Sequence, residues 1–135
     1  MTRRAVKGTL TLITVLTAFH SPSFGGGLSV SFSRDLAPLL RRKCAVCHLT
    51  GKEAGGLALH PKAAWKSLVN HPSSESHFLI VEPGAPEKSY LLMKLEGTHI
   101  DNGGSGAQMP FSAPPLDQDT INMFRTWIED GATNN

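Results

Sequence analysis

Two thiols and one imidazole lie within five consecutive residues of this chain, as Cys44, Cys47 and His48. Two residues separate the thiols, and this spacing places both sulfurs under the two vinyl groups at one edge of a porphyrin. The histidine that follows directly can then bind the iron from one side. The motif therefore predicts one covalently attached c-type haem, held by Cys44 and Cys47, with His48 as an axial ligand.

Cys-x-x-Cys pairs also occur in zinc sites and in thioredoxin-like redox centres. A zinc site needs further ligands, and the chain has no other cysteine. A thioredoxin-like pair is expected in a βαβ pattern, whereas this motif ends a predicted helix. Haem attachment is the favoured interpretation, and the thiol and zinc sites are its alternatives.

The N-terminal segment has the order of regions that is typical of a signal peptide. Three basic residues are followed by a ten-residue apolar stretch, Leu10–Phe19, and then by small residues. The stretch is shorter than the roughly 20 residues of a spanning helix. We expect residues 1–25 to be a signal peptide, residues 26–135 to be the mature domain, and its location to be periplasmic or otherwise exported. A permanent membrane anchor is the alternative.

The charge balance gives no support for nucleic-acid binding. The whole chain carries 13 basic and 11 acidic residues, and removal of the three N-terminal cations leaves 10 − 11 = −1. The expected mature chain of about 110 residues is one domain by size. With 13 Gly and 9 Pro in the chain, much of it is loop. A core this small is marginal by itself, and a buried porphyrin would supply apolar surface.

The first of four predicted helices carries the cysteines. Apolar residues and both cysteines recur from Phe32 to Cys47 at the spacing of one helical stripe. Both sulfurs are therefore expected on the buried face. Ser33 or Asp35 could cap the helix, and Asp35 is preferred because Pro38 then falls in the first turn, where no backbone donor is needed.

Three further helices follow, and no hairpin signal or strand series accompanies them. They are expected from Pro61 to about Asn70, from near Pro86 to Gly97, and from an N-cap at Asp117 to Gly131. The last should bury Ile121, Phe124, Trp127 and Ile128. The apolar run Phe78–Val81 could be extended. The expected fold class is all-α.

Met109 is the strongest candidate for the second axial ligand. A thioether sulfur suits low-spin haem iron, and histidine plus methionine ligation raises the reduction potential. Nearby glycines permit a close approach, and Pro110 and its neighbours limit the freedom of the loop. His99 and an open or water-bound iron are the alternatives. Met93 and Met123 fit core positions better, and the remaining histidines 60, 71 and 77 fit exposed or hydrogen-bonded positions.

At this point several motifs together resemble the planctomycete-type cytochrome c domain and, more broadly, class I cytochromes c. The motifs are Phe32-Ser33-Arg34-Asp35-Leu36-Ala37-Pro38-Leu39-Leu40, Cys44-x-x-Cys47-His48, Gly55-Gly56-Leu57, Pro83-Gly84-x-Pro86-Glu87-x-Ser89-x-Leu91, Met109-Pro110 and Trp127-Ile128-x-x-Gly131-Ala132. The resemblance covers Phe32 to Ala132. It implies a small class I cytochrome c fold, with about four helices and long loops wrapped around one haem.

The resemblance also implies that His48 is the proximal ligand and Met109 the distal ligand. The terminal helices should cross, so that Leu36 and Leu40 meet Phe124 and Trp127. Phe111 departs from the pattern, because many relatives have a second proline there, and this implies a less rigid ligand loop.

The function expected from these residues is one-electron transfer by a monohaem carrier, not enzymatic catalysis. A haem enzyme or gas sensor with an open distal site is the alternative, and a module without haem is a third possibility. A separate redox-partner protein is expected. The basic run Arg41, Arg42 and Lys43 could dock an acidic partner, although a solvated helix face is the simpler interpretation.

Overall fold

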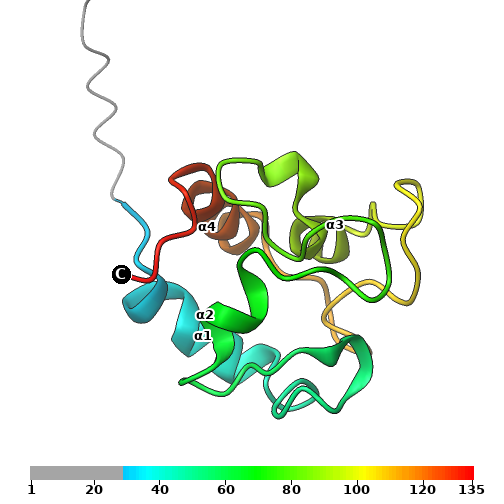
Figure 1. The fold of residues 1–135 in the computed structure, drawn as a ribbon, viewed down its shortest axis with the longest axis horizontal. Helices are drawn as coiled ribbons and strands as arrows, with labels where there is room; N and C mark the ends of the chain where they lie inside the picture. Colours follow the sequence, from blue (N-terminus) through cyan, green and yellow to red (C-terminus); the bar gives the residue numbers. More distant parts are fainter. Residues whose placement is uncertain (1–28) are drawn as a thin grey trace, which may run out of the picture.

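The computed structural model describes residues 29–135, so the predicted signal peptide, residues 1–25, lies outside the described residues. Within 29–135 the chain forms four α-helices and shorter helical turns but no named strand. The α-helices are α1 (Ala37–Lys43), α2 (Ala64–Leu68), α3 (Tyr90–Glu96) and α4 (Gln118–Glu129), which are labelled in Figure 1. The predicted all-α class is confirmed.

The first helix begins earlier than its sequence indicates. A π-helical turn, η1 (Phe32–Leu36), leads directly into α1, and Ser31 is the N-cap, with its side chain accepting from Arg34 N. The preference for Asp35 as the cap was therefore wrong, and so was the Ser33 alternative. The Asp35 carboxylate lies inside the first turn and accepts from Ser31 N at 2.9 Å. The carboxylate thus provides a hydrogen-bond acceptor for the backbone N–H of the N-cap residue, as the acidic residue of a capping box does.

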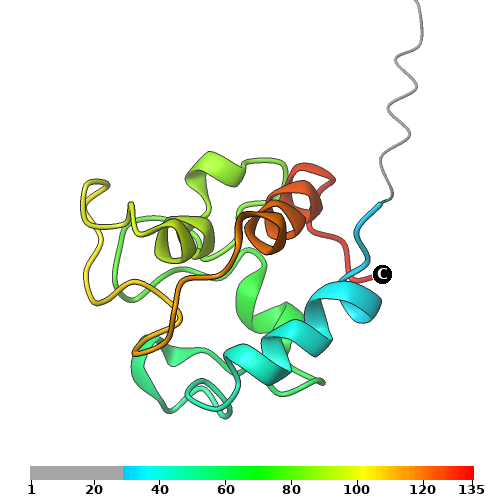
Figure 2. The same cartoon turned by 180° about the vertical axis from the view of Figure 1, so that it is seen from behind.

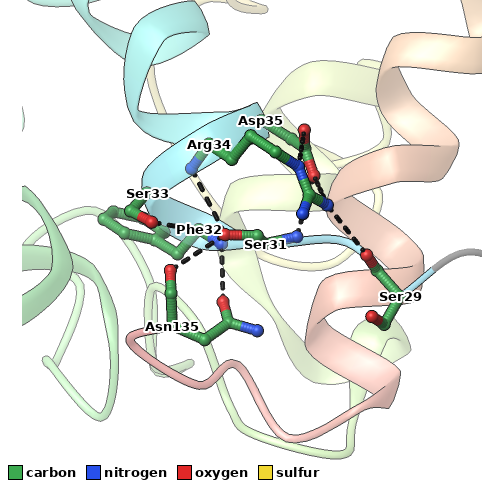
Figure 3. A network of polar contacts seen from close by, with 7 residues as sticks. All are labelled: Ser29, Ser31, Phe32, Ser33, Arg34, Asp35 and Asn135. Atoms are coloured by element: carbon green, nitrogen blue, oxygen red, sulfur yellow. Dashed lines mark hydrogen bonds and ion pairs between the residues drawn. The ribbon is translucent and has the colours of Figure 1, made fainter.

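The C-terminal residue Asn135 ties the end of the described chain to this first helical turn. Its backbone oxygen accepts from Ser31 Oγ and Ser33 N, each at 2.9 Å, and its side-chain oxygen accepts from Phe32 N at 2.7 Å (Figure 3). Backbone donors at a helix start lack intrahelical partners. Asn135 supplies acceptors for two of them, which holds the two ends of the fold together.

The core forms where η1 packs against α4. The rings of Phe32 and Trp127 lie 5.3 Å apart, and the Trp127 indole nitrogen donates to Thr133 O at 2.9 Å. Such an aromatic pair contributes about 0.5–1.5 kcal/mol beyond its buried area. Leu36, Leu40, Phe124 and Trp127 belong to one buried cluster. The packing of the first helical segment on the last helix agrees with the expectation for the terminal helices.

The predicted ends of α3 and α4 are confirmed. Gly97 ends α3 with a φ of 80°, and Asp117 caps α4 by accepting from Thr120 N at 2.8 Å. Gly131 follows the end of α4 with a φ of 94°, in the left-handed region that favours glycine at this position. From the exposed rim of α4, Arg125 pairs with Glu96 at 2.6 Å and with Glu87.

The central segments are shorter than expected. The helix predicted over residues 61–70 is reduced to α2, with a turn before it, and the one predicted from Pro86 is split into a 3-10 turn, η3 (Pro86–Lys88), and α3. The run Phe78–Val81 makes only isolated bridges, Val69 with Val81 and Pro72 with Leu79. The break between η3 and α3 lies at Ser89, whose backbone is extended and whose buried hydroxyl accepts from Glu82 N and donates to Ala85 O.

Two long loops lie on the side of the molecule away from the C-terminal tail. One follows α1 and carries the cysteine motif, and the other follows α3 and carries Met109. Figures 1 and 2 show both from opposite directions, with the loop after α3 in yellow at the edge of the molecule. The helices thus leave the predicted site residues on loops that face the same part of the structure.

Candidate functional site

The cysteine motif lies at the end of α1, as predicted. Cys44 is the C-cap, and its backbone oxygen accepts from Cys47 N and His48 N, both at 3.1 Å. The His48 backbone oxygen then accepts from Leu59 N at 2.8 Å. Cys44 is half-buried, whereas Cys47 is exposed. The prediction that both sulfurs share a buried face therefore holds for Cys44 alone, because the helix ends before Cys47.

A hydrogen-bonded turn supports the segment after His48. The Glu53 carboxylate accepts from Thr50 N and Gly51 N at 3.0 Å and from the Thr50 hydroxyl at 2.9 Å. These bonds, first of all the one from the Thr50 backbone, lower the pKa of Glu53 to about 2. The next residues form a 3-10 turn, η2 (Ala54–Gly56), in which Gly55 has a φ of 78°. This φ lies in the left-handed region that favours glycine, and a Cβ at Gly55 would make only an ordinary contact with His48 Cε1, at 4.0 Å.

The structure brings all four predicted site residues to one cavity. Cys44, Cys47, His48 and Met109 line a cavity with a volume of about 350 Å³. This volume lies within the roughly 300–1,000 Å³ of small-molecule and cofactor sites. The rest of the wall is mainly apolar and includes Leu40, Leu57, Leu59, Leu68, Leu91 and Leu95. An apolar cavity with two thiols, an imidazole and a thioether in its wall fits a planar, hydrophobic cofactor that is held covalently.

The imidazole of His48 has an incomplete set of hydrogen bonds. Its Nδ1 atom is buried and has no hydrogen-bond partner within the described residues. A buried polar atom of this kind is uncommon and calls for an explanation. Nδ1 of His99 lacks a partner in the same way, although His99 does not line the cavity. The unpaired atom therefore does not identify a metal ligand, and it is the position of His48 in the cavity wall that makes it a candidate.

A smaller recess of about 80 Å³ adjoins the cavity. The two share His48 and Met109, together with Ala54, Leu57 and Leu91, in their walls. No cysteine lines the recess, and most of its lining surface is apolar, as in the main cavity. Its polar side chains are Ser73, Glu75, Tyr90 and Lys94.

The loop with Met109 is bound to α3 by its backbone. Met109 N donates to Lys94 O at 2.9 Å, and the Gln108 side chain donates to Leu95 O at 3.0 Å. The Gln108 amide lies directly over Gly97, where a Cβ would come within 2.9 Å of it. The peptide bond between Met109 and Pro110 is cis. Phe111 is an exposed residue at the cavity edge.

Tyr90 and Lys94 hold the same loop by their side chains. The Tyr90 hydroxyl donates to Ser105 O at 3.0 Å and accepts from Ser105 N at 3.1 Å. Lys94 Nζ donates to Ser105 O at 2.9 Å and to Glu75 Oε2 at 3.0 Å. Neither residue was recognised from the sequence. The signal was present, because Lys94 stands on the face of α3 that also carries Leu91 and Leu95.

His99, the weaker candidate for the second ligand, has a different position. It is buried but does not line the cavity, and its Nε2 bonds to Gly106 O at 3.0 Å. A carbonyl oxygen only accepts, so Nε2 is the donor. His99 therefore serves the loop and is not directed at the cavity. Met93 is buried, Met123 is partly buried, and His71 and His77 are exposed, as predicted, while His60 is half-buried.

The electrostatics of Cys44 do not resemble those of a reactive thiol. Burial, with a smaller effect of Cys47, raises the pKa of Cys44 to about 11. Redox-active cysteines have lowered pKa values because the thiolate is the nucleophile. Both cysteines are free thiols in the structure. The raised pKa of Cys44 argues against dithiol exchange at this motif.

No group of three or more His, Cys, Asp and Glu side chains within residues 29–135 is arranged to hold a metal ion. No helix that the structure describes has the length and apolarity to cross a membrane.

Comparison with protein-family models, with curated proteins and with solved structures finds no match for this chain.

Proposed function

We propose that this protein is a monohaem c-type cytochrome that carries single electrons. The observation that supports this proposal best is the convergence of Cys44, Cys47, His48 and Met109 on one largely apolar cavity. These residues come from two loops that are 61 positions apart, counted from His48 to Met109. The motif alone does not require that convergence.

In the proposed holoprotein, Cys44 and Cys47 would hold the haem covalently, and His48 and Met109 would bind its iron. The haem supplies an iron that alternates between the ferric and ferrous states. The protein excludes water through its leucine-rich wall and supplies two strong ligands, so no coordination position is left open. Histidine with methionine also favours a relatively high reduction potential. These features suit reversible electron exchange with a separate redox-partner protein.

The alternative is a haem enzyme or gas sensor, which requires a vacant distal position. Met109 argues against it, because backbone and side-chain bonds hold its loop at the cavity. We also propose export to the periplasm or another extracytoplasmic location, on the basis of the N-terminal sequence. N-terminal sequencing of the exported protein should then begin near Gly26.

The decisive experiment is expression together with a cytochrome c maturation system. The denatured protein should carry the added mass of one haem, and its ferric spectrum should show the weak long-wavelength charge-transfer band of iron bound to methionine sulfur. A mass equal to that of the polypeptide would exclude covalent attachment. Rapid binding of carbon monoxide to the ferrous protein would instead support an open distal site.

A further inference from the structure

The polar side chains of the recess beside the main cavity have a chemical counterpart in the proposed cofactor. The two thiols lie in the main cavity, and the recess has none. Thioether bonds form at the vinyl-bearing edge of the porphyrin, and the two propionate carboxylates project from the other edge. Attachment at Cys44 and Cys47, with the iron between His48 and Met109, therefore directs a carboxylate toward the recess. This inference rests on the proposed function.

Lys94 is the unusual residue of the recess. It is only 6% exposed, and lysine is almost never that buried unless its charge is compensated. Its ammonium group has three donors, of which one meets Glu75 Oε2 and another meets Ser105 O. The remaining donor has no hydrogen-bond partner among the described residues, and the ammonium nitrogen also lies 5.7 Å from the centroid of the Tyr90 ring.

Two other polar side chains of the recess, Tyr90 and Ser73, differ in whether they still have a proton to donate. The Tyr90 hydroxyl already donates to Ser105 O and accepts from Ser105 N, so it has no proton left to offer. The Ser73 hydroxyl accepts from Glu75 N at 3.0 Å, and that bond leaves its own proton free. Two donors thus remain in the recess, one on Lys94 and one on Ser73.

We propose that Lys94, assisted by Ser73, is the binding site for a haem propionate. The ammonium provides charge and a hydrogen bond, and the hydroxyl provides a second hydrogen bond. Because Lys94 also binds Ser105 O and accepts from Met109 N through its backbone, one residue would join the carboxylate end of the cofactor to the loop of the distal ligand.

The ion pair with Glu75 offers another explanation for the buried position of Lys94. The Glu75 side chain is 30% exposed and lies 3.0 Å from Lys94 Nζ, so the lysine could serve merely to pair with Glu75 and hold the loop. If this is the role of Lys94, no haem propionate binds in the recess. The two roles differ when both charges are removed together, because the simple ion pair is then no longer needed, whereas a propionate still lacks its cation.

The experiment uses holoprotein whose haem carboxyl carbons are isotopically labelled through aminolevulinate. Infrared spectroscopy then reports the haem carboxylates separately from those of the protein. We expect one labelled band to move to the frequency of a solvated carboxylate in Lys94→Gln and to stay there in Lys94→Gln combined with Glu75→Gln. In Glu75→Gln alone, the same band should move in the opposite direction, because Lys94 loses its competing anion. The exposed Lys88→Gln is the control for loss of one positive charge and should leave both bands unchanged.

The results decide between the two roles of Lys94. Unchanged labelled bands in Lys94→Gln, or recovery of the original band in the double variant, would overturn the propionate site. Should Lys94→Gln fail to mature, Glu75→Gln decides alone, since a static band there contradicts the proposal. Absence of covalent haem from the unmodified protein would instead refute the proposed function, so the two failures are distinguishable.

Discussion

The two sides of the cavity are held in place by different kinds of interaction. On the His48 side, most hydrogen bonds join residues two to four positions apart, such as Gly51 with Glu53 and Cys44 with His48, and the bond from Leu59 N to His48 O spans 11 positions. On the Met109 side, Ser105 bonds to Lys94, Tyr90 and Glu75, which are 11, 15 and 30 positions away. The comparison indicates that local structure positions the first ligand and tertiary structure positions the second.

The largest effect should come from replacing both thiols. Cys44→Ser together with Cys47→Ser removes both sulfur nucleophiles, and we expect complete loss of covalent haem. The mass of the denatured protein should then equal that of the polypeptide. Single variants should retain at most one thioether bond. A full haem adduct in the double variant would contradict the role of this side of the cavity.

Met109→Ala tests the other side. We expect loss of the iron–sulfur charge-transfer band, a lower reduction potential and carbon monoxide binding by the ferrous protein, because the thioether favours ferrous iron. Met93→Leu is the matched control, since Met93 is buried in α3 and such swaps cost less than about 1.5 kcal/mol. An unchanged band in Met109→Ala would show that another residue is the ligand.

Tyr90→Phe tests whether the loop that carries Met109 can open separately, because the variant should loosen only that loop. The variant loses both bonds to Ser105, and we expect destabilisation of about 1 kcal/mol. In a denaturant titration, the charge-transfer band should disappear at a lower denaturant concentration than in the unmodified protein. The midpoint of the helical circular dichroism signal should shift less. Asn102→Ala, which removes only a bond to Thr98 within the loop, should shift neither midpoint appreciably. Equal shifts of both signals would mean that the loop does not open separately.

The smallest effect is expected from the local bonds of Glu53. Its pKa is lowered from 4.5 to about 2, so its contribution to stability is fully present above about pH 4.5 and is lost as the pH falls toward 2. Glu53→Gln should flatten this part of the stability profile in denaturant unfolding between these pH values. Glu129→Gln, at an exposed position on α4, is the control for loss of one negative charge. A profile as steep as that of the unmodified protein would mean that the turn contributes nothing.

Sequence patterns predicted the parts of the fold that depend on short-range rules. Asp117 and Gly97 were recognised because capping and left-handed termini have a local chemical signature. Ser31 was missed because the chain starts its first helix with a π-turn, which has no sequence signal of that strength. Helix η2 and the shortened α2 were also beyond reach, since their extent depends on the bonds of neighbouring loops.

The same division applies to the candidate site. The spacing of Cys44, Cys47 and His48 and the choice of Met109 could be read from the chain, because the chemistry of each group is a property of the residue. Folding is what brings these groups to one cavity and places Lys94 and Ser73 in a recess beside it. The physical reason is that burial and hydrogen-bond satisfaction are properties of the packed molecule. The role of Lys94, on an apolar face of α3, depends on Glu75 and Ser105, which come within hydrogen-bond distance of it only in the folded protein.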